Sequence, residues 1–126
     1  MSAESFNRGL TVRRQVLGQK YVDAALRRDG ELDAEFQRFV TEYCWDAIWT
    51  DDRLTRRERS LIVLAVTAAL GRDAEFRIHL AGALNNGIAP PELLAAIKQI
   101  SVYAGIPAGV SAMHSLREVL DSSTAD

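Results

Sequence analysis

The chain has 126 residues, of which 48% are hydrophobic, and a formal net charge of -2 at pH 7. This length suits one domain with a buried core and is too short for two, and the small net charge gives no broad attraction for nucleic acid or acidic membranes. The apolar run at residues 61–70 has about half the ~20 residues that a membrane span needs, and no N-terminal signal is visible, so we expect a cytoplasmic protein. Cys44 is the only cysteine, which excludes a disulfide within one chain.

Three helices are expected in the first half of the chain. Apolar spacing predicts a peripheral helix over Glu4–Leu17, closed by Gly18, and a short amphipathic helix over Gln19–Arg28, closed by Asp29-Gly30. A third helix is predicted over Leu32–Ile48. Its apolar positions are Phe36, Phe39, Val40, Tyr43, Cys44 and Ile48. A polar turn at residues 51–53 follows.

The stretch from Thr55 to Gly87 is the expected centre of the fold. Thr55 and Glu58 have the spacing of a capping box, which starts a helix there. Residues 61–70 are apolar except for Thr67, which predicts a helix surrounded by other helices. Gly71 can close that helix, and Asp73 can cap a second one that runs to Asn86-Gly87. A buried central helical hairpin is therefore expected.

Two further helices are predicted after the hairpin. One runs from about Pro91 to Tyr103 and the other over Ala108–Leu120, before a polar tail at residues 121–126. No stretch shows strand alternation, and nothing repeats at a fixed period. The sequence thus predicts a single all-α domain over residues 1–126 with about six to seven helices. Its alanine-rich later helices suit contact with another subunit, so a homo-oligomer is expected, although a compact monomer could use the same residues.

His79 is the main candidate for chemistry. It lies four residues after Glu75, so both share one face of a helix, where a carboxylate favours the protonated imidazole. This pair could act as a general acid and its orienting group. The alternative is a histidine packed at a helix interface beside a surface ion pair.

The remaining polar and aromatic candidates have simpler structural interpretations. His114 fits a surface or capping residue, and Trp45 with Trp49 fit a core pair better than a ligand platform. Arg56, Arg57 and Arg59 crowd a helix start, where either carboxylates or a bound anion must compensate for their charge. Two histidines without clustered acids indicate no catalytic metal. Neither a glycine-rich phosphate loop nor a nucleophile elbow occurs.

Taken together, six segments resemble the carboxymuconolactone decarboxylases over nearly the whole chain. They are Arg13-Arg14-Gln15-Val16-Leu17-Gly18, Tyr43-Cys44-Trp45 with Ile48-Trp49-Thr50, Arg59-Ser60-Leu61, Glu75-Phe76-Arg77-Ile78-His79-Leu80, Asn85-Asn86-Gly87 and Tyr103-Ala104-Gly105-Ile106-Pro107-Ala108. The resemblance implies an all-α homohexamer. It also implies decarboxylation of 4-carboxymuconolactone, a dicarboxylate lactone, to the β-ketoadipate enol-lactone in aromatic catabolism, without a cofactor, metal, nucleic acid or membrane.

The wider superfamily offers two alternative functions. Its peroxidase-like reductases carry Glu, then Cys-x-x-Cys, then His, and setting that His on His79 places Ser60, Arg72 and Glu75 at the other three positions. The redox residues are therefore absent here while the histidine remains. A peroxidase-like reductase and a non-catalytic oligomer are the alternatives to the lyase.

The resemblance also assigns roles to individual residues. For the implied reaction we expect His79 to deliver the proton, Glu75 to orient the His79 ring, Ser60 to hydrogen-bond near the lactone, and Arg59 or Arg14 to hold the remaining carboxylate. Trp45 and Trp49 are expected to wall the pocket.

The chain departs from the family pattern at several positions. Asp46 follows Trp45 where glycine is usual, and Asp51-Asp52-Arg53-Leu54 replaces Arg-Pro-Gly-Leu. Arg53 could supply the missing cation at a shifted position. Ala95 replaces the second acid of a Glu-x-x-Glu pair that begins at Glu92.

Overall fold

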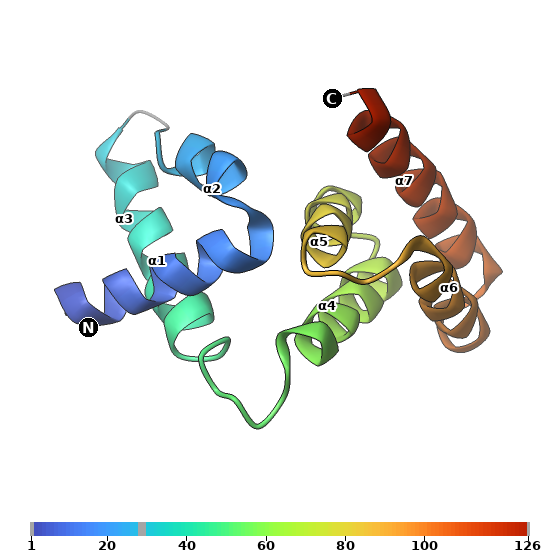
Figure 1. Ribbon diagram of the computed structural model, residues 1–126, viewed down its shortest axis with the longest axis horizontal. Helices are drawn as coiled ribbons and strands as arrows, with labels where there is room; N and C mark the ends of the chain where they lie inside the picture. Colours follow the sequence, from blue (N-terminus) through green and yellow to red (C-terminus); the bar gives the residue numbers. More distant parts are fainter. Residues whose placement is uncertain (1, 28–29, 126) are drawn as a thin grey trace. The chain divides into compact units, whose positions relative to one another are not determined.

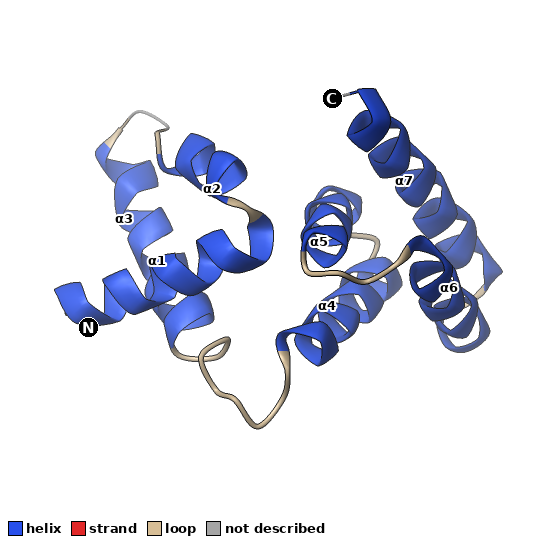
Figure 2. Cartoon of the chain, in the orientation of Figure 1, coloured by secondary structure: helices blue, strands red, loops and turns tan. Residues whose placement is uncertain are grey.

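The computed structural model describes residues 2–27 and 30–125, with side chains described to residue 122. Within these ranges the chain is helical and contains no strand (Figure 2). Its elements are α1 (Ala3–Leu17), α2 (Gln19–Leu26), α3 (Glu31–Val40), the π-helical segment η1 (Thr41–Asp46), α4 (Arg56–Leu70), α5 (Asp73–Asn85), α6 (Pro90–Ala104) and α7 (Ile106–Ala125). The predicted all-α class is confirmed. The predicted end of the second helix at Arg28 and Asp29 lies outside the described residues.

The helices form two compact units along the chain (Figure 1). The N-terminal unit, Met1–Arg56, contains α1, α2, α3 and η1. The C-terminal unit, Arg57–Asp126, contains α4, α5, α6 and α7. Each unit has its own buried residues and is described by itself.

In the N-terminal unit, α1 packs closely against η1. Gly9 makes this possible, because a Cβ there would overlap the carbonyl oxygen of Thr41. Arg8 adds an ion pair to Asp46, with Nε 3.0 Å from Oδ1 and Nη2 3.3 Å from Oδ2. Gly18, at φ 94°, ends α1 as predicted and allows the turn into α2.

The predicted helix over Leu32–Ile48 is not one regular α-helix. It is α-helical to Val40 and then widens into η1. The change occurs at Thr41, whose hydroxyl donates to the Gln37 carbonyl at 2.7 Å and accepts from Arg13 Nη1 at 3.1 Å. These side-chain bonds and the contact with α1 compete with regular helical pairing, which is how local π-turns arise.

The core of the C-terminal unit is built from all four of its helices. Its buried residues are Leu64, Ala68, Phe76, Leu80, Ala83, Ile88, Leu93, Ile97, Ile100, Ala112 and Leu116. The last two helices turn at Gly105 and approach closely, since a Cβ at Gly109 would overlap the Ser101 side chain (Figure 1). Gly105 has φ 108°, a conformation that favours glycine.

The helix predicted to be buried on all sides is only partly buried. In α4 the inward residues are Ser60, Leu64 and Ala68. Ile62 and Val66 are half exposed, and Leu70 is more exposed still. Within its own unit, α4 is therefore not buried on every side as predicted, because the other helices of the unit cover only one side of it.

Other boundaries in the C-terminal unit also differ from the prediction. The last helix, α7, begins at Ile106, two residues before the predicted Ala108. Arg72, rather than Asp73, is the N-cap of α5, so Asp73 is the first residue of the helix. The tail predicted from residue 121 instead continues α7 to Ala125. Residues 121–125 include neither glycine nor proline, the two residues that most disfavour a helix, so α7 can continue through them.

Candidate functional site

His79 lies on α5 beside core residues. Its neighbours along the helix, Phe76, Leu80 and Ala83, are buried, whereas His79 is partly buried. Burial lowers the pKa of His79 from 6.5 to about 4, and the charge of Glu75 opposes this shift without cancelling it. The free protein therefore holds a neutral imidazole at pH 7.

Glu75 lies one helical turn before His79 and is exposed. The predicted sign of its effect is correct, since its carboxylate raises the His79 pKa. The sequence predicted that Glu75 would favour the protonated imidazole. In the free chain the His79 pKa is lowered instead, because desolvation of the ring has a larger effect than the charge of Glu75.

Ser60 and Arg59 are adjacent on α4 in the same unit as His79. Ser60 is 1% exposed, and its hydroxyl has no hydrogen-bond partner among the described residues. A buried hydroxyl without a hydrogen-bond partner costs about 1 to 3 kcal/mol of stability. The Ser60 hydroxyl could therefore donate a hydrogen bond to a ligand. Arg59 is partly buried, unlike the exposed Arg56 and Arg57 before it.

The other three predicted binding residues belong to the N-terminal unit. Trp45 and Trp49 are buried, with ring centroids 4.7 Å apart. Arg14 lies on α1, where its Nε and Nη2 donate to Asp23 Oδ1 at 3.0 and 2.8 Å. This ion pair engages the Arg14 guanidinium, so a ligand there has to compete with Asp23.

Two of the acidic departures from the family pattern, Asp46 and Asp51, have partners within the N-terminal unit. Asp46 pairs with Arg8, as described above. Asp51 accepts from the Arg53 backbone N–H at 3.0 Å and from its guanidinium Nε at 3.0 Å. Arg53 is thus folded onto Asp51 in the turn, which argues against its serving as a shifted substrate cation.

Arg13 is a buried cation next to Arg14, and the family resemblance did not point to it as a binding residue. It is 5% exposed, and burial lowers its pKa. Nη1 donates to Thr41, whereas Nε has no hydrogen-bond partner among the described residues. The spacing of Gly9, Val12, Arg13 and Val16 along α1 places Arg13 on the buried side, and this pattern could have identified it.

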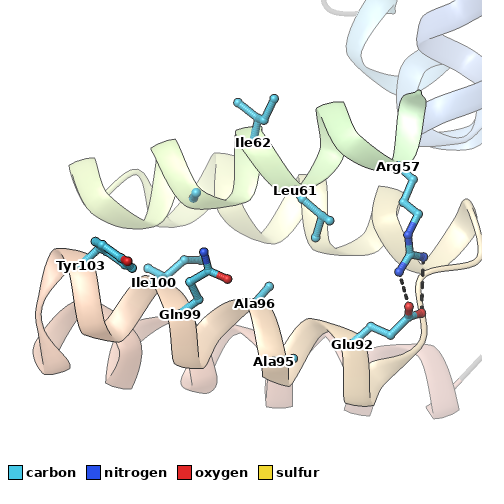
Figure 3. Close-up of a pocket in the computed structure, with 10 residues that line it drawn as sticks. Arg57, Leu61, Ile62, Glu92, Ala95, Ala96, Gln99, Ile100 and Tyr103 are labelled. Carbon is cyan, nitrogen blue, oxygen red and sulfur yellow. Dashed lines mark hydrogen bonds and ion pairs between the residues drawn. The ribbon is translucent and has the colours of Figure 1, made fainter. Parts of the chain in front are cut away.

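A groove of about 680 Å³ runs between α4 and α6 (Figure 3). Apolar and alanine side chains line most of it, and Tyr103 and Gln99 lie toward one end. Arg57 and Glu92 form an ion pair at the other end, and Arg57, followed by the Ala89 N–H, lowers the Glu92 pKa. His79 and Ser60 do not line this α4–α6 groove.

Among the described residues, no three His, Cys, Asp or Glu side chains gather closely enough to hold a metal ion. Over those residues, too, no helix is both long and apolar enough to span a bilayer.

The helical fold and the partly buried histidine on α5 agree with the family that the sequence as a whole matches. The chain belongs to the carboxymuconolactone decarboxylase family, whose pattern covers residues 34–118. It is 40% identical over 116 residues to 4-carboxymuconolactone decarboxylase of Acinetobacter baylyi, covering 92% of this chain and 87% of the relative. It is also 35% identical over 108 residues to a nitrosuccinic acid decarboxylase of Metarhizium robertsii, covering 86% of this chain and 76% of the relative.

Proposed function

We propose that this protein decarboxylates 4-carboxymuconolactone to the β-ketoadipate enol-lactone without a cofactor, as a carbon-carbon lyase of aromatic catabolism. The observation that carries the proposal is the 40% identity to a 4-carboxymuconolactone decarboxylase over 92% of the chain. The partly buried His79, one turn after Glu75, supports it by supplying a titratable group on a helix of the core.

The substrate contains its own electron sink. The departing carboxylate lies on the ring carbon gamma to an unsaturated lactone carbonyl. When that carbon-carbon bond breaks, its electrons move through the double bond onto the carbonyl oxygen as carbon dioxide leaves. A proton then adds to the carbon alpha to the carbonyl. The protein has to bind a dianion, stabilise the dienolate oxygen and supply that proton.

His79 is the proposed proton donor, although it is neutral before the substrate binds. Two substrate carboxylates brought near the imidazole raise its pKa, so the ring takes up a proton as the substrate enters. Glu75 acts in the same direction. Burial then favours loss of that proton to the dienolate, because the charged ring is poorly solvated.

The residues proposed to bind the lactone and the retained carboxylate are chosen by whether their polar groups already have partners within the protein. Ser60 is proposed to donate to the lactone, since its buried hydroxyl has no other partner among the described residues. Arg59 is preferred over Arg14 for the retained carboxylate, because Asp23 occupies Arg14. Trp45 and Trp49 pack against each other as a buried pair in the N-terminal unit, so we assign them no contact with the lactone.

The relative from Metarhizium robertsii favours a second candidate substrate. Its name is that of a decarboxylase of nitrosuccinic acid. A nitro group, like a conjugated lactone, can accept the electrons of a departing carboxylate. Small dicarboxylates with a built-in electron sink are therefore the substrate class to compare. A peroxidase-like reductase is less favoured, because burial raises the pKa of the lone Cys44 thiol and keeps it protonated.

We further propose that the protein assembles as a homo-oligomer, a hexamer by resemblance to its family. The exposed apolar residues of α4 support this assembly, as do Val102, Ile106 and Val110 at the turn between α6 and α7. Light scattering is expected to give a mass several times 13.9 kDa at micromolar concentration. A stable monomer would contradict this part of the proposal.

The activity is tested with freshly generated 4-carboxymuconolactone. Loss of lactone absorbance with release of one carbon dioxide per molecule is expected, and exhaustive chelation is expected to leave the rate unchanged. Nitrosuccinic acid serves as the comparison substrate, and peroxide with a thiol donor tests the reductase. Turnover of peroxide alone, or of neither acid, would overturn the proposed lyase.

A further inference from the structure

An exposed apolar ridge runs along α3 and into η1. It consists of Leu32, Phe36, Phe39 and Tyr43, which are 85%, 60%, 46% and 64% exposed. Spacings of four, three and four residues place these side chains on one side of the helix. The Phe39 and Tyr43 rings stack with their centroids 5.3 Å apart. Large apolar side chains gathered in one exposed row mark a contact surface.

The α4–α6 groove is complementary in shape to this ridge. Its small residues are Ala65, Ala95 and Ala96, which leave space for large side chains from outside. It extends along α6 from Glu92 to Tyr103, a length of about 16 Å at 1.5 Å per residue. The ridge covers the same number of residues, from Leu32 to Tyr43, and so also has a length of about 16 Å.

We propose that the ridge of one copy of this chain docks into the α4–α6 groove of a second copy. The aromatic side chains of the ridge enter the spaces above the groove alanines, as knobs of one helix enter holes on another. Each copy offers one ridge and one groove, so two copies can make the contact twice around a two-fold axis. This inference names the surfaces of the proposed assembly and does not depend on the catalytic activity.

Charge fixes the direction of docking. The Leu32 end of the ridge carries three exposed acids, namely Glu31, Asp33 and Glu35. The end of the groove where α4 begins carries Arg56, Arg57 and Arg59 against Glu58 and Glu92, a positive balance. Opposite charges meet when the Leu32 end lies at the Arg57 end, and they also guide association.

Cross-linking between differently tagged chains tests the contact directly. Both chains carry Cys44→Ala to remove the native thiol. One chain also carries Phe36→Cys and the other Ala96→Cys, and the two are coexpressed and treated with a short bis-maleimide. A covalent species bearing both tags is expected. Tyr21→Cys in place of Phe36→Cys is the control, because Tyr21 is an exposed aromatic residue outside the ridge, and it is expected not to cross-link. A chain carrying both Phe36→Cys and Ala96→Cys that cross-links only within itself would overturn the proposal.

Disruption of the ridge gives an independent measurement. Phe36→Glu with Phe39→Glu is expected to weaken self-association at least tenfold in sedimentation velocity, while the helical circular dichroism stays unchanged because both residues are exposed. Tyr21→Glu is the matched control and is expected to assemble like the wild type. A monomeric wild type would overturn both the proposed oligomer and this contact. An oligomeric wild type whose double variant assembles equally well would overturn this contact alone.

Discussion

Glu75 precedes His79 by one turn of α5, and its charge raises the His79 pKa by less than burial lowers it. His79→Gln is expected to leave the helical fold intact while lowering turnover of 4-carboxymuconolactone by roughly 10² to 10⁴, because positioned proton transfer contributes about that much. Steady-state kinetics with circular dichroism measure both effects. If His79 is only a packed residue, the variant instead loses about 1 to 3 kcal/mol of stability and keeps its turnover.

Glu75→Gln is the companion change to His79→Gln. Removing this carboxylate lowers the His79 pKa further, so the falling limb of the pH-rate profile is expected to move to lower pH. The loss of turnover should be smaller than in His79→Gln, since the imidazole remains. A profile identical to that of the wild type would remove Glu75 from the mechanism.

Acid should destabilise the fold through His79. The His79 pKa is about 4 in the folded protein and 6.5 in the unfolded chain. Between these pH values the unfolded chain therefore binds more protons than the folded protein. The free energy of unfolding is therefore expected to fall as the pH drops from about 6.5 toward 4, by about 2 to 3 kcal/mol from this residue. Urea unfolding at several pH values measures the slope. His79→Gln should reduce that slope.

The two candidate arginines are expected to differ. Arg59→Gln should raise KM for the dicarboxylate by about 10- to 100-fold, because a hydrogen bond to a charged group contributes about 1.5 to 3 kcal/mol. Arg14→Gln should change KM much less, since Asp23 already engages that guanidinium. Thermal unfolding of both variants controls for loss of fold. The reverse order of KM values would transfer the carboxylate-binding role to Arg14.

Cys44→Ala should retain most decarboxylase activity. The thiol is partly buried, and burial raises its pKa, so it stays protonated at neutral pH. Turnover before and after the substitution is the relevant comparison. A folded but inactive variant would restore the thiol hypothesis.

Gly9→Ala should destabilise the N-terminal unit. The added Cβ meets the Thr41 carbonyl oxygen, and backbone atoms cannot move aside as a flexible side chain can. A loss of about 1 to 3 kcal/mol is expected, the usual effect of overpacking, and chemical denaturation measures it. Asn7→Ala on the exposed side of α1 is the control and should stay within about 0.5 kcal/mol of the wild type.

The sequence by itself determined the helical class and most helix limits of this protein. Glycines at 18, 71 and 105 stop helices for local reasons, and helical spacing alone places His79 one turn after Glu75. The family resemblance was also present in the sequence, because it depends on residue order and not on packing.

Only the tertiary structure decided how strongly each group is buried and which partner it has. The spacing of Glu75 and His79 indicated the sign of their interaction, but desolvation by neighbouring helices made the imidazole neutral. Likewise, Arg13 and Arg14 are adjacent in sequence, yet one is buried against Thr41 and the other pairs with Asp23. The apolar pattern of α4 predicted burial on every side, whereas its own unit covers one side only, because a hydrophobic pattern does not specify which chain supplies the contact.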